Sequence, residues 1–188
     1  MRVALAELVE RFRRDDSARV ADHIPALACA DPGWFGLAFA DVDGTVHEAG
    51  DSRVAFTIQS VSKPFVYALA LAELGMDEVH RHVGAEPTGE AFSAISLEPG
   101  TGRPANPMIN AGAIVTAALA PGASAAERIG RILATLSAFA GPDLEVDEQT
   151  LRSERSTGDR NRVWATAGAA RSPVPGWWTS RSRRRCSR

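Results

Sequence analysis

The chain has 188 residues, which is long enough for one domain with a sizeable hydrophobic core. Hydrophobic residues make up 45% of it and the net charge is −2, but no apolar run approaches the roughly 20 residues of a membrane helix. The two cysteines, Cys29 and Cys186, are too few and too distant for a disulfide scaffold or a metal site, so we expect a cytoplasmic protein without a metal ion.

The predicted elements begin with a helix over residues 3–13, where apolar residues recur at three- and four-residue spacing. Short apolar runs then flank Asp43-Gly44, a tight-turn dipeptide. The expected strands are residues 34–40, 45–47 and 54–58. The expected later helices are residues 63–74, 111–120, 124–139 and a last one from 147. Strands first and helices after indicate an α+β domain, with helices against an antiparallel sheet.

Local signals mark the ends of two of these helices. Ser124 followed by Glu127 is a capping box, in which a hydroxyl and a carboxylate accept hydrogen bonds from the first amides of a helix. Gly75 and Gly141 each follow an apolar helical run and are expected to end it.

The strongest chemical signal is Ser60-Val61-Ser62-Lys63, directly before the apolar helix. Residues three apart on a helix share a face, with Cβ atoms about 5–6 Å apart, so this spacing brings an amine to a hydroxyl. An amine activates a serine only when its pKa is depressed, and burial has that effect. Lys63 is also the only lysine among 21 basic residues. The alternative is that Ser60 or Ser62 caps the helix while Lys63 lies in solvent.

Three blocks extend this signal. Residues 56–89 (FTIQSVSKPFVYALALAELGMDEVHRHVGAEPTG) contain the S-x-x-K tetrapeptide, and NPMINAGAIV (106–115) and SERSTGDRN (153–161) follow. In this order and separation they resemble the serine-dependent, β-lactamase-like glutaminases over residues 17–162. The resemblance implies a partial serine β-lactamase/transpeptidase-like α+β fold, in which residues 1–162 are the N-terminal part of the glutaminase catalytic domain. A β-lactamase or transpeptidase is a rival interpretation, but no S-D-N or K-T-G element is present.

The resemblance implies hydrolysis of L-glutamine to L-glutamate and ammonia. Ser60 would form the acyl-enzyme and Lys63 would be its base. The substrate-binding positions of the family correspond to Ser60, Asn110, Glu154 and Asn161. This set suits a free amino acid, because a carboxylate binds its ammonium and neutral amides bind its carboxylate and amide. Taken singly, each residue has a milder alternative: a helix cap for Asn110, pairing with Arg152 or Arg155 for Glu154, and a turn for Asn161.

The resemblance also implies what the protein binds. The expected partner is the small-molecule substrate, with further copies of the chain in a homo-oligomer such as a homotetramer. No metal or organic cofactor, nucleic acid or membrane is expected.

The sequence departs from the family pattern in three places. His23 stands where the family usually has a tyrosine, and Ser93 replaces an asparagine. After Asn161 the resemblance stops, and residues 163–188 are expected to be an irregular or disordered basic tail, with six arginines and no acid from residue 171. The only tyrosine, Tyr67, is expected in the core, so the family's catalytic tyrosine has no candidate. The alternative function is therefore a truncated or frameshifted, inactive relative.

Overall fold

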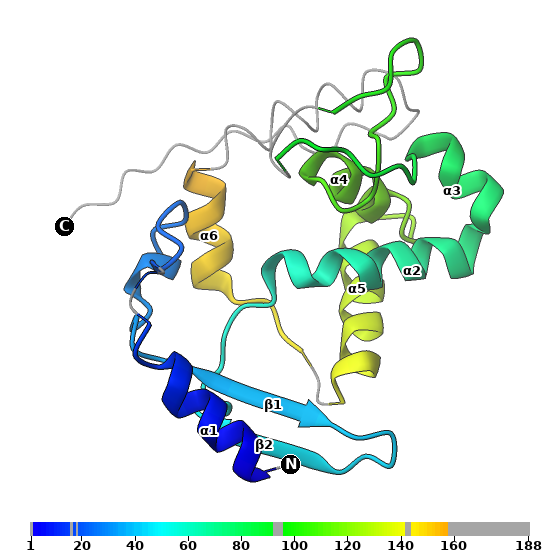
Figure 1. The fold of residues 1–188 in the computed structure, drawn as a ribbon. Helices are drawn as coiled ribbons and strands as arrows, with labels where there is room; N and C mark the ends of the chain where they lie inside the picture. The colour runs from blue at the N-terminus through cyan, green and yellow to red at the C-terminus, as the bar shows by residue number, and fades with distance from the viewer. Residues whose placement is uncertain (1, 16, 18, 92–95, 142–143, 158–188) are drawn as a thin grey trace. The chain divides into compact units, whose positions relative to one another are not determined.

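A computed structural model describes residues 2–15, 17, 19–91, 96–141 and 144–157 (Figure 1). These residues form two compact units. The first contains residues up to 57 together with 147–157, and the second contains residues 58–146. Among the described residues, no helix has both the length and the apolar character that crossing a membrane requires.

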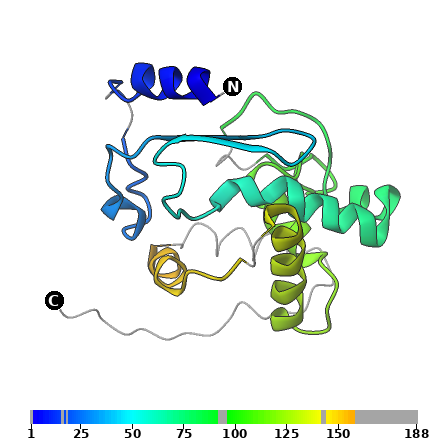
Figure 2. The same ribbon diagram turned by 90° about the horizontal axis from the view of Figure 1, so that it is seen from below.

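The first unit is built around a β-hairpin with a helix beside it. Its elements are α1 (Arg2–Phe12), the 3-10 turn η1 (Leu27–Cys29), β1 (Gly36–Ala40), β2 (Val46–Gly50) and α6 (Glu148–Thr157). The two strands are antiparallel, with Gly36 opposite Gly50. Helix α1 packs on the hairpin and buries Leu5 and Val9, and Figures 1 and 2 both show the helix alongside the two strands. Ser153 Oγ of α6 accepts a hydrogen bond from the Ala26 amide at 3.1 Å, which joins α6 to the segment before β1.

The tight turn predicted at Asp43-Gly44 is confirmed. Gly44 has a φ of 86°, a left-handed conformation that glycine adopts without steric cost. The Thr45 amide donates to Asp43 Oδ1 at 2.9 Å, a local side-chain bond that reinforces the turn. The hairpin thus forms where the sequence predicts it.

The prediction of a third strand over residues 54–58 is wrong. The Val54 amide donates to the Asp51 carbonyl oxygen at 3.0 Å in a turn, and the side chain of Phe56 is 85% exposed. A strand needs a neighbouring strand for its backbone hydrogen bonds. Within the described residues the sheet consists of β1 and β2 only. Residues 54–58 are mostly apolar, but they do not pair with either strand.

The second unit is a group of helices. Its elements are the 3-10 turn η2 (Gln59–Val61), α2 (Ser62–Leu74), α3 (Met76–His82), α4 (Asn110–Ala118) and α5 (Ala125–Ala140). Helix α2 packs against α3, α4 and α5, as Figure 1 shows. The centre of this packing is formed by Ala70, Val79 and Val83, which are fully buried. The helices predicted in this region are confirmed to within a few residues at each end.

The helix ends follow the local signals in the sequence. Ser124 Oγ accepts a hydrogen bond from the Glu127 amide at 3.2 Å, and Glu127 Oε2 accepts one from the Ala123 amide at 2.8 Å. Gly75 ends α2 with a φ of 79°, and Gly141 ends α5 with a φ of 89°. Six α-helices and two antiparallel strands among the described residues agree with the predicted α+β class.

Candidate functional site

The backbone turns sharply where the chain enters α2. Gln59 has a φ of 46°, and it is the only residue other than glycine with a positive φ among the described residues. Such a conformation costs on the order of 1 kcal/mol and persists where the surrounding structure fixes it, which is most often at functional sites. It directly precedes Ser60, whose side chain is exposed on the turn before α2.

Lys63 lies in the first turn of α2 and is half-buried. Its Nζ donates one hydrogen bond to the Met108 carbonyl oxygen at 3.0 Å and another to Asn110 Oδ1 at 2.9 Å. Burial lowers the pKa of Lys63 below its ordinary value of 10.5, because the charged ammonium loses hydration. The lysine is therefore held by the segment before α4 and by α4 itself, and it is easier to deprotonate than a lysine in water.

The capping interpretation of the two serines does not fit the structure. The residue that caps α2 is Val61, and no side chain accepts a capping hydrogen bond there. The Ser62 hydroxyl donates back to the Gln59 carbonyl oxygen at 2.7 Å. Ser60 lies in η2, and Lys63, three residues later, lies in the first turn of α2.

Asn110 is the first residue of α4, and the capping position belongs to Ile109. The Asn110 side chain thus does not serve as the helix cap, which was the milder alternative. In the bond from Lys63 the acceptor atom is Oδ1, and the amide nitrogen Nδ2 carries two hydrogens that can be donated. The side chain can therefore hold the lysine at one end and donate to a carbonyl or carboxylate oxygen at the other.

Glu154 lies on α6 in the first unit and is half-buried. The predicted alternative, pairing with Arg152 or Arg155, does not occur among the described residues, and Arg152 lies 3.9 Å from Glu148 instead. Within the described residues, Glu154 therefore forms no ion pair. Asn161 and Ser93 lie outside the described residues, and His23 is exposed in the first unit.

The Tyr67 hydroxyl is hydrogen-bonded to His80 Nε2 at 2.8 Å, and the two rings are nearly parallel. Tyr67 also packs against the buried core of the second unit, as its predicted place in the core requires.

His82 lies 3.2 Å from Glu78. In the described part of the chain, no group of three or more His, Cys, Asp or Glu side chains gathers in a way that could hold a metal ion.

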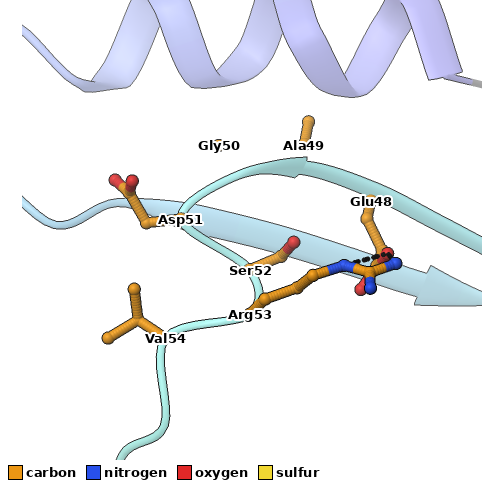
Figure 3. Close-up of a pocket in the computed structure, with 7 residues that line it drawn as sticks. All are labelled: Glu48, Ala49, Gly50, Asp51, Ser52, Arg53 and Val54. Atoms are coloured by element: carbon orange, nitrogen blue, oxygen red, sulfur yellow. Dashed lines mark hydrogen bonds and ion pairs between the residues drawn. The ribbon is translucent and has the colours of Figure 1, made fainter.

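A surface hollow of about 400 Å³ lies in the first unit, lined by residues 48–54 (Figure 3). Its main polar feature is Arg53, whose guanidinium donates to Glu48 Oε2 at 2.6 and 3.1 Å. None of the predicted site residues lines it.

Comparison with known proteins relates this arrangement to one family. The sequence profile described as Glutaminase matches residues 18–171. The glutaminase of Clavibacter michiganensis subsp. michiganensis is 56% identical over 161 residues, which cover 86% of this chain and 49% of that protein. The chain spans between about a quarter and a half of the length of the curated relatives it matches.

Solved structures agree with the sequence comparison. The structure of Mglu in its glutamate form is 44% identical, with a TM-score of 0.86 over 93% of this chain and 41% of that one. The probable glutaminase from Bacillus subtilis complexed with 6-diazo-5-oxo-L-norleucine is 33% identical, with a TM-score of 0.76 over 87% of this chain and 49% of that one. The similarity confirms the predicted α+β fold over part of the length of these structures.

Proposed function

The chain belongs to the glutaminase family, and on this premise we propose that the start of α2, together with α4, is the nucleophile site of an amidohydrolase acting on L-glutamine. Ser60 Oγ attacks the side-chain amide carbon of glutamine while Lys63 takes the hydroxyl proton. The C–N bond then breaks, ammonia leaves with the transferred proton, and an ester to Ser60 remains. Water hydrolyses this ester to release L-glutamate and restore the serine.

The observation that carries the proposal is the environment of Lys63. An amine can serve as the base for serine only in its neutral form, and the half-buried lysine has a lowered pKa. Its bonds to the Met108 carbonyl oxygen and to Asn110 hold it in the first turn of α2, three residues after Ser60. The partial positive charge at the helix start, with the backbone amide of Ser60, stabilises the oxyanion that forms during attack.

We assign substrate binding to Asn110, Glu154 and Asn161, as the family resemblance implies. The Nδ2 donor of Asn110 suits an oxygen of glutamine, and the carboxylate of Glu154 suits the ammonium. The solved relatives with glutamate or with 6-diazo-5-oxo-L-norleucine, a reactive analogue of glutamine, support a substrate of this class.

Covalent labelling of the full chain by 6-diazo-5-oxo-L-norleucine tests the proposal without requiring turnover. Ser60 Oγ displaces N₂ from the protonated diazo group, and one adduct appears in the intact mass and in the peptide that contains Ser60. Ser60→Ala should abolish the adduct. Ser62→Ala is the matched control and should label like the wild type, because the Ser62 hydroxyl is already bonded to Gln59. An adduct that persists in Ser60→Ala would overturn the assignment.

A second candidate is an inactive relative that lacks the family's catalytic tyrosine. The only tyrosine in the sequence is Tyr67, and its hydroxyl is hydrogen-bonded to His80 Nε2 at 2.8 Å. Ammonia release from L-glutamine separates the two: turnover with Ser60 labelling supports the enzyme, and labelling without turnover supports a relative with a nucleophile but an incomplete reaction cycle.

The remaining assignments follow from the resemblance and the composition. We propose that residues 1–162 are part of a glutaminase catalytic domain, that 163–188 form a basic tail, and that the protein is a cytoplasmic homo-oligomer. Two distant cysteines suit a reducing compartment. Sedimentation of the purified chain tests the oligomer, and a monomer at all concentrations would refute it.

A further inference from the structure

The side chain of Asn106 organises the turn that leads into α4. Its Oδ1 accepts hydrogen bonds from the Met108 amide at 3.0 Å and the Ile109 amide at 3.2 Å. Its Nδ2 donates to the Glu86 carbonyl oxygen at 3.0 Å. Two donors at one end and an acceptor at the other leave a single orientation for the amide group, so the side chain is fixed.

The backbone of this turn is also closely packed. The Glu86 amide donates to the Ala105 carbonyl oxygen at 3.2 Å, which ties residue 86 to the segment before Asn106. A Cβ on Gly112 would lie 1.9 Å from the Asn106 carbonyl oxygen, so the absence of a side chain there lets α4 touch the turn. Asn106 is therefore held from both sides, by the 84–86 segment and by the first turn of α4.

The same turn carries two acceptors of the lysine. The Met108 amide is bonded to Asn106 and the Met108 carbonyl oxygen is bonded to Lys63 Nζ. Asn110 directly follows Ile109, whose amide is the second donor to Asn106. The direction of the Met108 carbonyl and the position of Asn110 thus depend on the conformation that Asn106 stabilises.

We propose that Asn106 is a positioning residue for Lys63: its side-chain oxygen builds the turn that presents the Met108 carbonyl oxygen and the Asn110 amide to the lysine amine. The inference deepens the proposed function, because it names the residue that places the base. Asn106 acts through Met108 and Asn110 and has no contact with the serine in this account.

The lysine itself supplies the test, because the chain has only one. In the full chain produced with ¹³C-labelled lysine, a single side-chain signal reports the titration of Lys63 by NMR. In the wild type the midpoint should lie below 10.5, as burial lowers the pKa. Asn106→Ala should release the amine to water and move the midpoint toward 10.5, while circular dichroism shows an unchanged helix content.

Asn106→Ser is the matched variant, since it differs from Asn106→Ala by one oxygen atom. A serine hydroxyl in such a turn accepts hydrogen bonds from the following amides much as asparagine does. Its lysine should titrate close to the wild type. A folded Asn106→Ala chain with the wild-type midpoint, or a folded Asn106→Ser chain with a midpoint at 10.5, would overturn the proposal.

Two further points keep the test decisive. If Asn106→Ala does not fold, amide hydrogen exchange of the wild type decides: the Met108 and Ile109 amides should be protected, and exchange at the rate of open amides overturns the proposal. The lysine titration does not require Ser60 to react. An unchanged titration in Asn106→Ala with normal Ser60 labelling would overturn the role of Asn106 alone. The expected titration shift without Ser60 labelling would overturn the proposed function alone.

Discussion

The start of α2 and helix α6 each carry a residue that the sequence marks for chemistry, and the structure defines their surroundings to different degrees. Lys63 is held in the second unit by two hydrogen bonds to the segment around Met108 and Asn110. Glu154, on α6 in the first unit, has no ion-pair partner in the described part of the chain. The lysine therefore has hydrogen-bond partners within its own unit, whereas the ligand-binding role proposed for the carboxylate depends on a cation that the substrate would supply.

A catalytic base and a substrate-binding carboxylate need different partners. A base must be oriented toward its serine before any substrate arrives, so its partners belong to the protein. A substrate-binding carboxylate should remain unpaired until the substrate supplies the cation. The predictions below separate these two situations, beginning with the largest effect.

Replacing the base should have the largest effect. Lys63→Met removes the amine while keeping an unbranched side chain, and general-base catalysis contributes about 10²- to 10⁴-fold, so labelling of Ser60 should slow by that factor. Lys63→Arg should be as slow, because a guanidinium stays charged in proteins. The rate of adduct formation by mass spectrometry is the measurement, and wild-type labelling of Lys63→Arg would refute the role of the amine.

Gly112→Ala tests the close packing of α4 against the Asn106 turn. The added Cβ would lie 1.9 Å from a backbone carbonyl oxygen, so the free energy of unfolding should fall by about 3 kcal/mol, the upper end for overpacking. Gly130→Ala on α5 is the control: its Cβ meets no atom within 4 Å, and it should stabilise the helix by about 0.5–1 kcal/mol. Urea unfolding measures both, and equal stabilities would contradict the packing.

The smallest of these effects is expected on α6. Glu154→Gln removes the charge that is proposed to bind the substrate ammonium. A charge-assisted hydrogen bond is worth about 1.5–3 kcal/mol, so half-maximal labelling should need about 10- to 100-fold more reagent. The Lys63 NMR signal should not change. Glu148→Gln on the same helix is the control, because that side chain is 65% exposed and should leave labelling unaffected. Equal effects of the two variants would refute the role of Glu154.

Much of the fold could be predicted because its signals are local. Apolar spacing located the helices other than α3, for which no helix was predicted. Ser124 with Glu127 located the start of α5, since a helix end depends on residues within one turn. The strand at 54–58 failed for the opposite reason. A strand needs a partner elsewhere, and an apolar run such as the one around Phe56 does not reveal whether that partner exists.

The candidate site was predictable only in part. The three-residue spacing of Ser60 and Lys63 predicts that the two side chains share a face, and this stays a prediction. The Met108 carbonyl oxygen could not be predicted as an acceptor, because the direction of a carbonyl depends on backbone conformation and not on the residue type. The one available signal was the Asn106-Pro107 dipeptide, which favours a turn.

The central claim is that Lys63 works as a neutral amine, and the pH dependence of Ser60 labelling tests it most directly. Deprotonation creates the base, so the labelling rate should rise with pH through the pKa of Lys63, with a midpoint below 10.5 because burial disfavours the ammonium. In Lys63→Met the rate should be slow and lack this rise. A wild-type rate without such a rise, or the same rise in Lys63→Met, would contradict the account.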